Sequence, residues 1–479
     1  MAELVNLVAR LRARERGQAV AIVNQRQQLI LPDALILTML SMAGEDTSVH
    51  AIAIGQAGQP AEIAAAGDPR DRDAQYALLR WLLPRVESYF SACLAAGSFP
   101  QIWVSSAGAL GHLDTLADRL RFTDEPDIQR LGLLLSYCGG RSFVAGQQTL
   151  MCATGALRNH YATGQEEAED EHLGALLTWI EPPQGRDIFA AVEMAEAQPM
   201  GFKTDPRFDK DHLMPAVQDY NAARAAGDAQ QIERRRARIE GLLESVIRPI
   251  HAATQRAIGL LSSPHWRENA ALEELGQQEA DEFADYMAAR AQGYGVTYRD
   301  SPKAAAYRLV ARERAVANVE AATVRHDRAA REKGVASGLV VRATLVSATK
   351  TRLAPYKFRH DVALVSHQDS LHLRRGDVLW TLDDPSLGIL VDTVTARGPF
   401  TEINGELIKG MRSIGAISLG TALDFGPKAS DWNMVGEFAQ MGVRLTHTPW
   451  THGETMPAAA PVATRVMPND LLGTVERLI

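Results

Sequence analysis

The sequence predicts a multidomain α+β protein that combines a mixed α/β domain, a long helical segment and a small antiparallel β-barrel. Three observations predict this class. Short apolar runs alternate with helical patterns in residues 1–221, Ala, Arg and Glu dominate residues 222–335, and the apolar period changes to two in residues 336–425. The 479-residue chain is too long for one domain, because domains usually hold about 100 to 200 residues.

The first predicted domain, residues 1–221, is acidic. It holds 18 Lys and Arg against 28 Asp and Glu, and the whole chain has a net charge of −8. This balance excludes an overall basic nucleic-acid binder, so any such contact has to be local. The acidic peak at residues 165–172 fits either a cation site or a solvated loop before a helix, whose dipole favours acidic residues there. We interpret it as the loop.

Residues 222–335 predict long helices, which we call the helical arm. Ile232, Ile239 and Leu243 recur at helical spacing among charged residues, so one stripe is apolar. Pro249 is expected to kink or end this helix, because an interior proline removes a backbone donor. Narrow stripes cannot form a core alone, so we expect the helices to pair as a hairpin or bundle resembling an imperfect coiled coil. The stripe is then expected to face something outside the chain's globular parts.

Residues 336–425 predict a meander of five or six short strands, which is the size of a small barrel. Asn404 and Gly405 lie between two strand-like runs and predict a type I′ hairpin turn, because both central residues of that turn need positive φ. Residues 362–365 are all apolar, which predicts a strand buried on both faces. Residues 426–479 contain Pro, Gly and His-rich pieces that predict an irregular tail.

Basic and aromatic residues gather in two adjacent segments of the predicted barrel. Cations interleaved with aromatic rings suit phosphate contacts and base stacking. Residues 336–425 nevertheless hold ten basic against nine acidic residues, so the barrel as a whole is nearly neutral. The candidate nucleic-acid-binding residues are Lys350, Arg352, Tyr356, Lys357, Phe358, Arg359, Arg374 and Arg375.

A metal-dependent hydrolase or nuclease is the rival hypothesis. Asp205, Asp209, Asp211 and His212 lie within eight positions and could offer ligands to a divalent ion from one loop. Aspartates at this place can instead cap the helix that follows, which is a routine role of Asp at a helix start. We prefer the capping interpretation, and we assign no metal site or catalytic residue.

Two further patterns favour structural roles. His360, His367 and Asp369 interrupt a strand-like run, but alternation along the strand separates them, so we expect surface residues and not zinc ligands. Cys138 has flexible glycines beside it and His160 follows, which raises the question of a catalytic dyad. A free cysteine is more often a small buried apolar residue, and we interpret Cys138 in that way.

The sequence therefore predicts a cytoplasmic accessory subunit or adaptor that needs no cofactor and has no membrane contact. The apolar run at residues 34–44 is too short for a bilayer, which takes about 20 residues. Three cysteines without paired spacing indicate neither a disulfide framework nor a zinc site. We expect a protein partner or a second copy at the helical arm and take DNA or RNA as a candidate partner of the barrel. A self-assembling structural protein is the third hypothesis.

Overall fold

The computed structural model describes residues 2–45, 48–293, 302–354, 357–383 and 387–426. The chain divides into two compact units, one of Met1–Val296 with Ala315–Ala429 and one of Thr297–Arg314 with Ser430–Ile479. It is a mixed α+β protein, and its described strands form three sheets. Of the predicted tail, only Gly426 is among the described residues.

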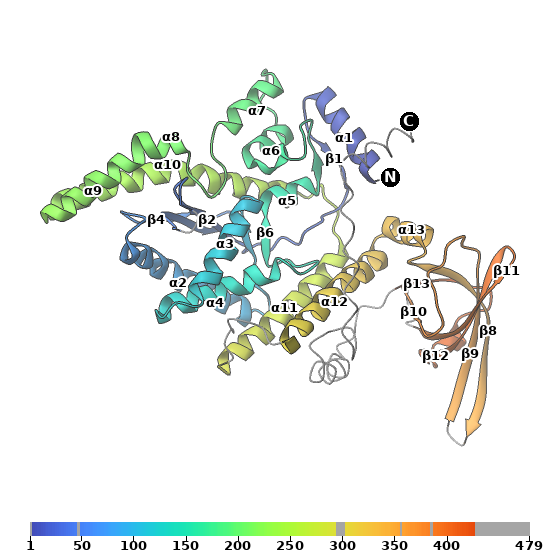
Figure 1. Ribbon diagram of the computed structural model, residues 1–479. Helices are drawn as coiled ribbons and strands as arrows, with labels where there is room; N and C mark the ends of the chain where they lie inside the picture. Colours follow the sequence, from blue (N-terminus) through green and yellow to red (C-terminus); the bar gives the residue numbers. More distant parts are fainter. Residues whose placement is uncertain (1, 46–47, 294–301, 355–356, 384–386, 427–479) are drawn as a thin grey trace, which may run out of the picture. The chain divides into compact units, whose positions relative to one another are not determined.

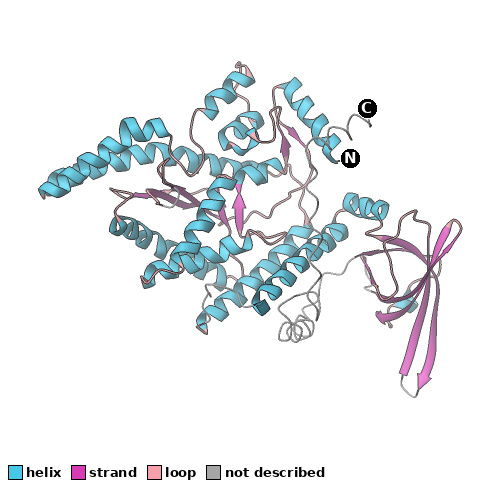
Figure 2. Ribbon diagram, in the orientation of Figure 1, coloured by secondary structure: helices cyan, strands magenta, loops and turns pink. Residues whose placement is uncertain are grey.

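A five-stranded sheet with the order β4-β3-β2-β5-β6 forms the centre of the N-terminal part of the chain (Figure 2). The central strand β2 is antiparallel to β3 and parallel to β5, and all six of its residues are buried. A strand that is buried along its whole length, with Thr38 as its one polar residue, fits a sheet covered on both faces. The five strands are β2 (Leu35–Leu40), β3 (Ala51–Gln56), β4 (Glu62–Ala65), β5 (Ile102–Val104) and β6 (Leu150–Cys152). A separate short pair joins β1 (Val20–Ala21) to β7 (Tyr161–Ala162).

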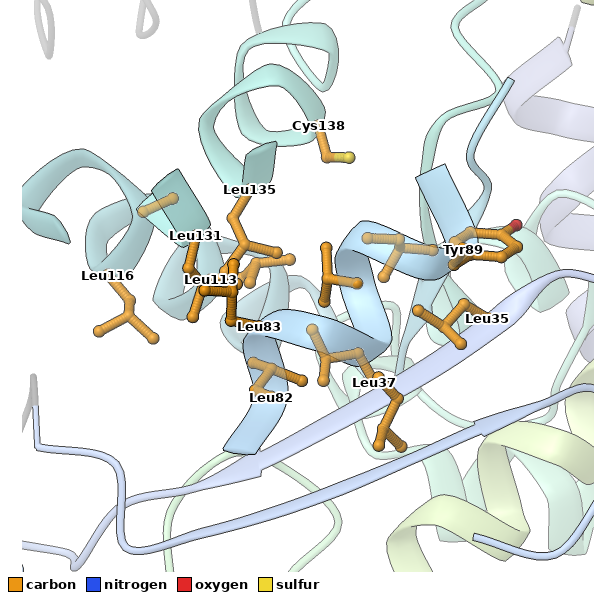
Figure 3. Packing of buried hydrophobic residues seen from close by; sticks show 14 of the residues in the cluster. Leu35, Leu37, Leu82, Leu83, Tyr89, Leu113, Leu116, Leu131, Leu135 and Cys138 are labelled. Carbon is orange, nitrogen blue, oxygen red and sulfur yellow. The ribbon is translucent and has the colours of Figure 1, made fainter. Parts of the chain in front are cut away.

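Three helices cover one face of this sheet. They are α2 (Arg72–Ala95), α3 (Ala107–Leu120) and α4 (Pro126–Arg141). Leu35 and Leu37 point toward this face because alternate residues of a strand share a side, and they pack with Leu82 and Leu113 in one apolar cluster (Figure 3). The Ser106 hydroxyl accepts a hydrogen bond from the Ala109 amide and so caps the start of α3.

The long helix α10 (Ala229–Leu261) packs against the other face of the sheet. Its apolar stripe includes Leu243, Ile247 and Ile250, which are fully buried in a cluster with Leu40 of β2. The expectation that this stripe faces something outside the globular parts is therefore wrong for α10. The physical reason is that the sheet exposes a second apolar face, and α10 is the element that covers it.

The helix α10 also continues through Pro249, where the sequence predicted a kink or an end. Pro249 lies on the exposed side of the helix, between the buried residues Ile247 and Ile250. Water can solvate the carbonyl group that the proline leaves without a donor, and the contacts of Ile247 and Ile250 with the sheet hold both sides of the helix in place. Burial of the opposite face outweighs the local cost of the proline.

The other parts of the predicted helical arm attach by separate contacts. Phe283 of α11 (Ala270–Ala291) is fully buried in the cluster around α2 and α4. In α12 (Pro302–His326), Arg325 donates to Glu274 of α11 at 2.9 Å. The helical arm is thus no independent hairpin, since α10 and α11 complete the core of the N-terminal region. The remaining helices are α1 (Ala2–Arg16), α5 (Ala153–Arg158), α6 (Leu173–Ile180), α7 (Ile188–Glu196), α8 (Pro206–Phe208), α9 (Met214–Ala226), α13 (Arg328–Ser337) and the short turns η1 (Glu169–Glu171), η2 (Asp209–Leu213) and η3 (Ile414–Ala416).

The third sheet is a closed ring of six antiparallel strands, with the order β10-β11-β12-β9-β8-β13. The strand number matches the prediction, whereas the predicted meander is wrong, because β9 pairs with β12 and β10 pairs with β13. The strands are β8 (Val341–Ala354), β9 (Lys357–Ser366), β10 (Val378–Thr381), β11 (Gly388–Arg397), β12 (Phe400–Lys409) and β13 (Ala422–Gly426). Strands distant in sequence therefore close the ring.

Asn404 and Gly405 do not form a turn, contrary to the prediction. Both lie inside β12, and the chain turns at Gly398, which has a φ of 66°. The register between β11 and β12 shifts beside Gly405, and a Cβ atom there would clash with the backbone carbonyl oxygen of Leu390 in β11 and lie 2.8 Å from Cγ2 of Ile389. Glycine is therefore needed at a strand irregularity where two backbones approach closely, and not for positive φ.

The interior of the ring is apolar and draws on alternate residues of its strands. In β9, Val362 and Leu364 are buried while Ala363 and Val365 are half-buried. The prediction that residues 362–365 are buried on both faces is wrong, because a small ring packs one face of each strand inward. This alternation sets which side chains of β8 and β9 face outward.

Candidate nucleic-acid interface

Strands β8 and β9 extend beyond the ring as a two-stranded projection (Figure 1). Pairing of β8 with β13 ends at Thr344, and pairing of β9 with β12 ends at Asp361. Among the described residues, the segments 350–354 and 357–360 consequently pair only with each other. We call these two segments the β-ribbon. It holds five of the eight residues predicted to bind nucleic acid.

One face of the β-ribbon combines cations with rings. Lys350 pairs with His360 and Arg352 pairs with Phe358, and directly paired residues share a face. The Lys350 Nζ atom lies 4.2 Å from the centroid of the Phe358 ring, which is a cation–π contact. Lys350 and Arg352 are exposed, and Phe358 is 43% exposed. We call these four residues the cationic face.

The opposite face of the β-ribbon is neutralised by ion pairs. Arg359 lies 2.5 Å from Asp361, 2.5 Å from Asp392 and 3.8 Å from Glu406. Hydrogen bonding to Asp361 raises the pKa of Arg359. Thr351 donates to the same Asp361 at 3.4 Å. Three carboxylates around one guanidinium make this face unfavourable for a phosphate, so the two faces differ in sign.

The structure therefore divides the residues predicted to bind nucleic acid. Lys350, Arg352 and Phe358 lie together on the cationic face, whereas Arg359 lies on the other face within the ion-paired cluster. For Lys357 the structure gives the backbone pairing with Ala354. Tyr356 lies outside the described residues. Sequence spacing grouped these residues, and strand alternation separated them.

Arg374 and Arg375 lie apart from the β-ribbon in chain order, in the connection between β9 and β10. Both are exposed, and the Arg374 amide donates to Asp377 at 2.7 Å in a local turn. Leu371 and Leu373, just before them, pack against the core of the ring. Both arginines lie outside the β-ribbon, and we do not assign them to the candidate interface.

A charged cluster surrounds the start of β8, inside the ring. Arg342 donates to Asp424 of β13 at 2.7 Å and to Glu332 of α13 at 2.9 Å. Hydrogen bonding to Asp424 and Glu332 raises the pKa of Arg342, so it stays charged. These bonds join the first paired residues of β8 to β13 and to α13, and so they anchor the start of β8 within the ring.

The alternative metal site does not assemble. Asp205 caps α8 by accepting from the Arg207 amide at 2.7 Å, and Asp209 is buried and accepts from the Ala43 amide at 2.8 Å. Asp211 and His212 are exposed on one turn of π-helix. Within the described residues, no group of three His, Cys, Asp or Glu side chains could hold a metal ion. Among these described residues, His360, His367 and Asp369 also belong to no such group.

The cysteine and histidine considered as a dyad have other partners. Cys138 is fully buried, and burial raises the pKa of its thiol, which disfavours the nucleophilic thiolate. The His160 Nδ1 atom lies 2.8 Å from the Ala156 carbonyl oxygen, and its Nε2 atom accepts from the Gln27 amide at 3.1 Å. Both ring nitrogens of His160 serve the local fold.

A polar pair that the sequence analysis missed lies in the N-terminal sheet. Ser41 follows the carboxyl end of β2, and its Oγ atom lies 3.4 Å from Nε2 of His112 on α3. This is where ligands commonly bind in α/β sheets, at the point where strand order reverses. Both residues are buried, and the Phe202 ring stacks on His112 with centroids 4.6 Å apart. No motif links residues 71 positions apart, so sequence could not have revealed this pair.

Comparisons with protein-family models, with curated proteins and with solved structures found no match for this chain. Among the described residues, none of the helices combines the length and apolar character that a bilayer-crossing helix requires.

Proposed function

We propose that this protein is an accessory subunit that binds nucleic acid through the cationic face of its β-ribbon. The observation that carries the proposal is the strand register, because it gathers Lys350, Arg352 and Phe358 on one uncovered face. A two-stranded ribbon is narrow enough to enter a groove or follow a single strand, and cations beside an aromatic ring provide both phosphate contacts and stacking.

The net charge of the chain is compatible with this function because the charges are segregated. The overall charge is −8, and the carboxylates nearest to the β-ribbon are occupied by Arg359 on the opposite face. A nucleic acid is thus attracted to one face and repelled from the other, which fixes its direction of approach. Local attraction of this kind needs no basic domain.

Binding measured at several salt concentrations tests the proposal. Fluorescence anisotropy of labelled DNA and RNA oligonucleotides with the purified full-length protein should show affinity that falls as salt rises, because phosphate contacts release counterions. Lys350→Ala with Arg352→Ala should lower the slope of log K against log salt by about 1.4 to 1.8, at about 0.7 to 0.9 per lost contact.

The matched control is Lys333→Ala with Arg412→Ala, which removes the same charge from exposed cations outside the β-ribbon. It should leave the slope unchanged. Equal losses in the two double variants would mean that only net charge matters, and a protein without salt-sensitive binding would refute the proposal.

A further inference from the structure

We infer that the cationic face takes unpaired nucleic acid, with a base stacked on Phe358 and neighbouring phosphates held by Lys350 and Arg352. This inference rests on the proposed function and adds the class of nucleic acid. The composition of the cationic face favours stacking with bases. Two of the four residues on the face, Phe358 and His360, present flat rings, and paired strands place both on the same side as the two cations.

The ring of Phe358 is accessible to a ligand. The Phe358 ring is 43% exposed, and Lys350 lies 4.2 Å from its centroid. The exposed part of this ring is open to a ligand beside Lys350, and a base has a π-face that stacks on an aromatic ring. Within a duplex the bases already stack on each other, and their edges are read by side chains such as Arg, Asn and Gln. Phenylalanine cannot make those hydrogen bonds.

The spacing of Lys350 and Arg352 fits the phosphates of a single strand. Arg352 pairs directly with Phe358, and Lys350 lies two residues from Arg352 on the same side of β8. Residues two apart along a strand are separated by about 6.6 Å, which is close to the distance between successive phosphates of an extended strand. A single strand that follows β8 can therefore meet both cations while one of its bases reaches Phe358.

The test compares labelled oligothymidine of about 16 nucleotides, within the site size of single-strand binders, with a duplex of the same length. The full-length protein should bind the single strand more tightly. Phe358→Ala should weaken single-strand binding by about 5- to 150-fold, which corresponds to the loss of one stacked base, and should leave duplex binding unchanged. Phe358→Trp keeps an aromatic ring at this position and should retain single-strand binding. Phe189→Ala, which removes a ring that is 45% exposed on α7, is the matched control.

The outcomes separate this inference from the proposed function. A duplex that binds as tightly as the single strand, or a Phe358→Ala variant with normal single-strand affinity, overturns the inference while loss of binding in Lys350→Ala with Arg352→Ala still supports the function. If neither oligonucleotide binds, the proposed function fails and the inference fails with it. Thermal melting of each variant shows whether the ring remains folded.

Discussion

Helix α10 and the β-ribbon are both long, arginine-bearing elements with two unlike faces, yet they have opposite fates in the fold. The middle of the apolar stripe of α10 is fully covered, with Ile247 at 0% exposure, whereas Phe358 of the β-ribbon is 43% exposed. A stripe of apolar residues indicates that one face of a helix is buried in the fold, and the neighbouring sheet buries that face of α10. Within the described part of the chain, the β-ribbon extends past the strands that pair with β8 and β9 in the ring. Exposure in the assembled fold, and not amphipathic pattern, therefore distinguishes a core element from a binding element.

The largest effect on stability is expected in the buried stripe of α10. Ile247→Ala removes a fully buried side chain from the cluster between α10 and the sheet, so the free energy of unfolding should fall by about 2 to 5 kcal/mol. Urea denaturation followed by circular dichroism measures it. Arg248→Ala on the exposed side, which removes an ion pair with Glu244, should cost at most about 0.5 kcal/mol. Equal effects would show that the stripe is not buried in solution.

The stability of the protein is expected to depend on pH, because two histidines are buried. Burial lowers the pKa of His251 on α10 and of His50 before β3 from 6.5 to about 4. Between these values the unfolded chain binds protons that the folded chain excludes, so stability is lost as the pH falls from 6.5 toward 4, by about 3 kcal/mol for each histidine. His251→Phe should flatten the dependence measured by urea denaturation at each pH. An unchanged pH profile would contradict the burial of this ring.

In the ring, the expected effect is smaller and local. Gly405→Ala places a Cβ atom 2.8 Å from Cγ2 of Ile389, so the free energy of unfolding should fall by about 1 to 3 kcal/mol. Gly415→Ala is the control, because nothing lies within 4 Å of its added Cβ. Differential scanning calorimetry of both variants measures the difference. If Gly405→Ala is neutral, the irregularity between β11 and β12 does not require close backbone contact.

The smallest stability effect is expected in the β-ribbon itself. Lys350→Ala with Arg352→Ala removes two exposed side chains and should change the free energy of unfolding by less than about 0.5 kcal/mol. The same variant should lose nucleic-acid affinity. A large stability loss measured by urea denaturation would instead show that these cations support the fold, and the contrast with α10 would disappear.

Some elements of the fold could be predicted from local sequence patterns, and others could not. Local signals predicted five or six strands in the C-terminal region, where the ring has six, and helices over residues 222–335, since period and composition are local properties. They failed at Asn404 and Gly405, where a turn-like dipeptide lies within a strand beside a register shift. They also grouped Arg359 with Lys350, because spacing along the chain does not reveal the carboxylates of Asp392 and Glu406 that reach Arg359 from neighbouring strands.

The sequence by itself determined that this chain mixes α and β structure, that α10 has one apolar side, and that cations and aromatic rings cluster near residues 350–359. Those are consequences of residue type and order. Only the tertiary structure decided which faces remain open. Burial depends on elements distant in sequence: β2 and β3 cover the stripe of α10, and the ring ends where β12 and β13 stop pairing with β9 and β8. Long-range contacts of this kind leave no trace in local periodicity.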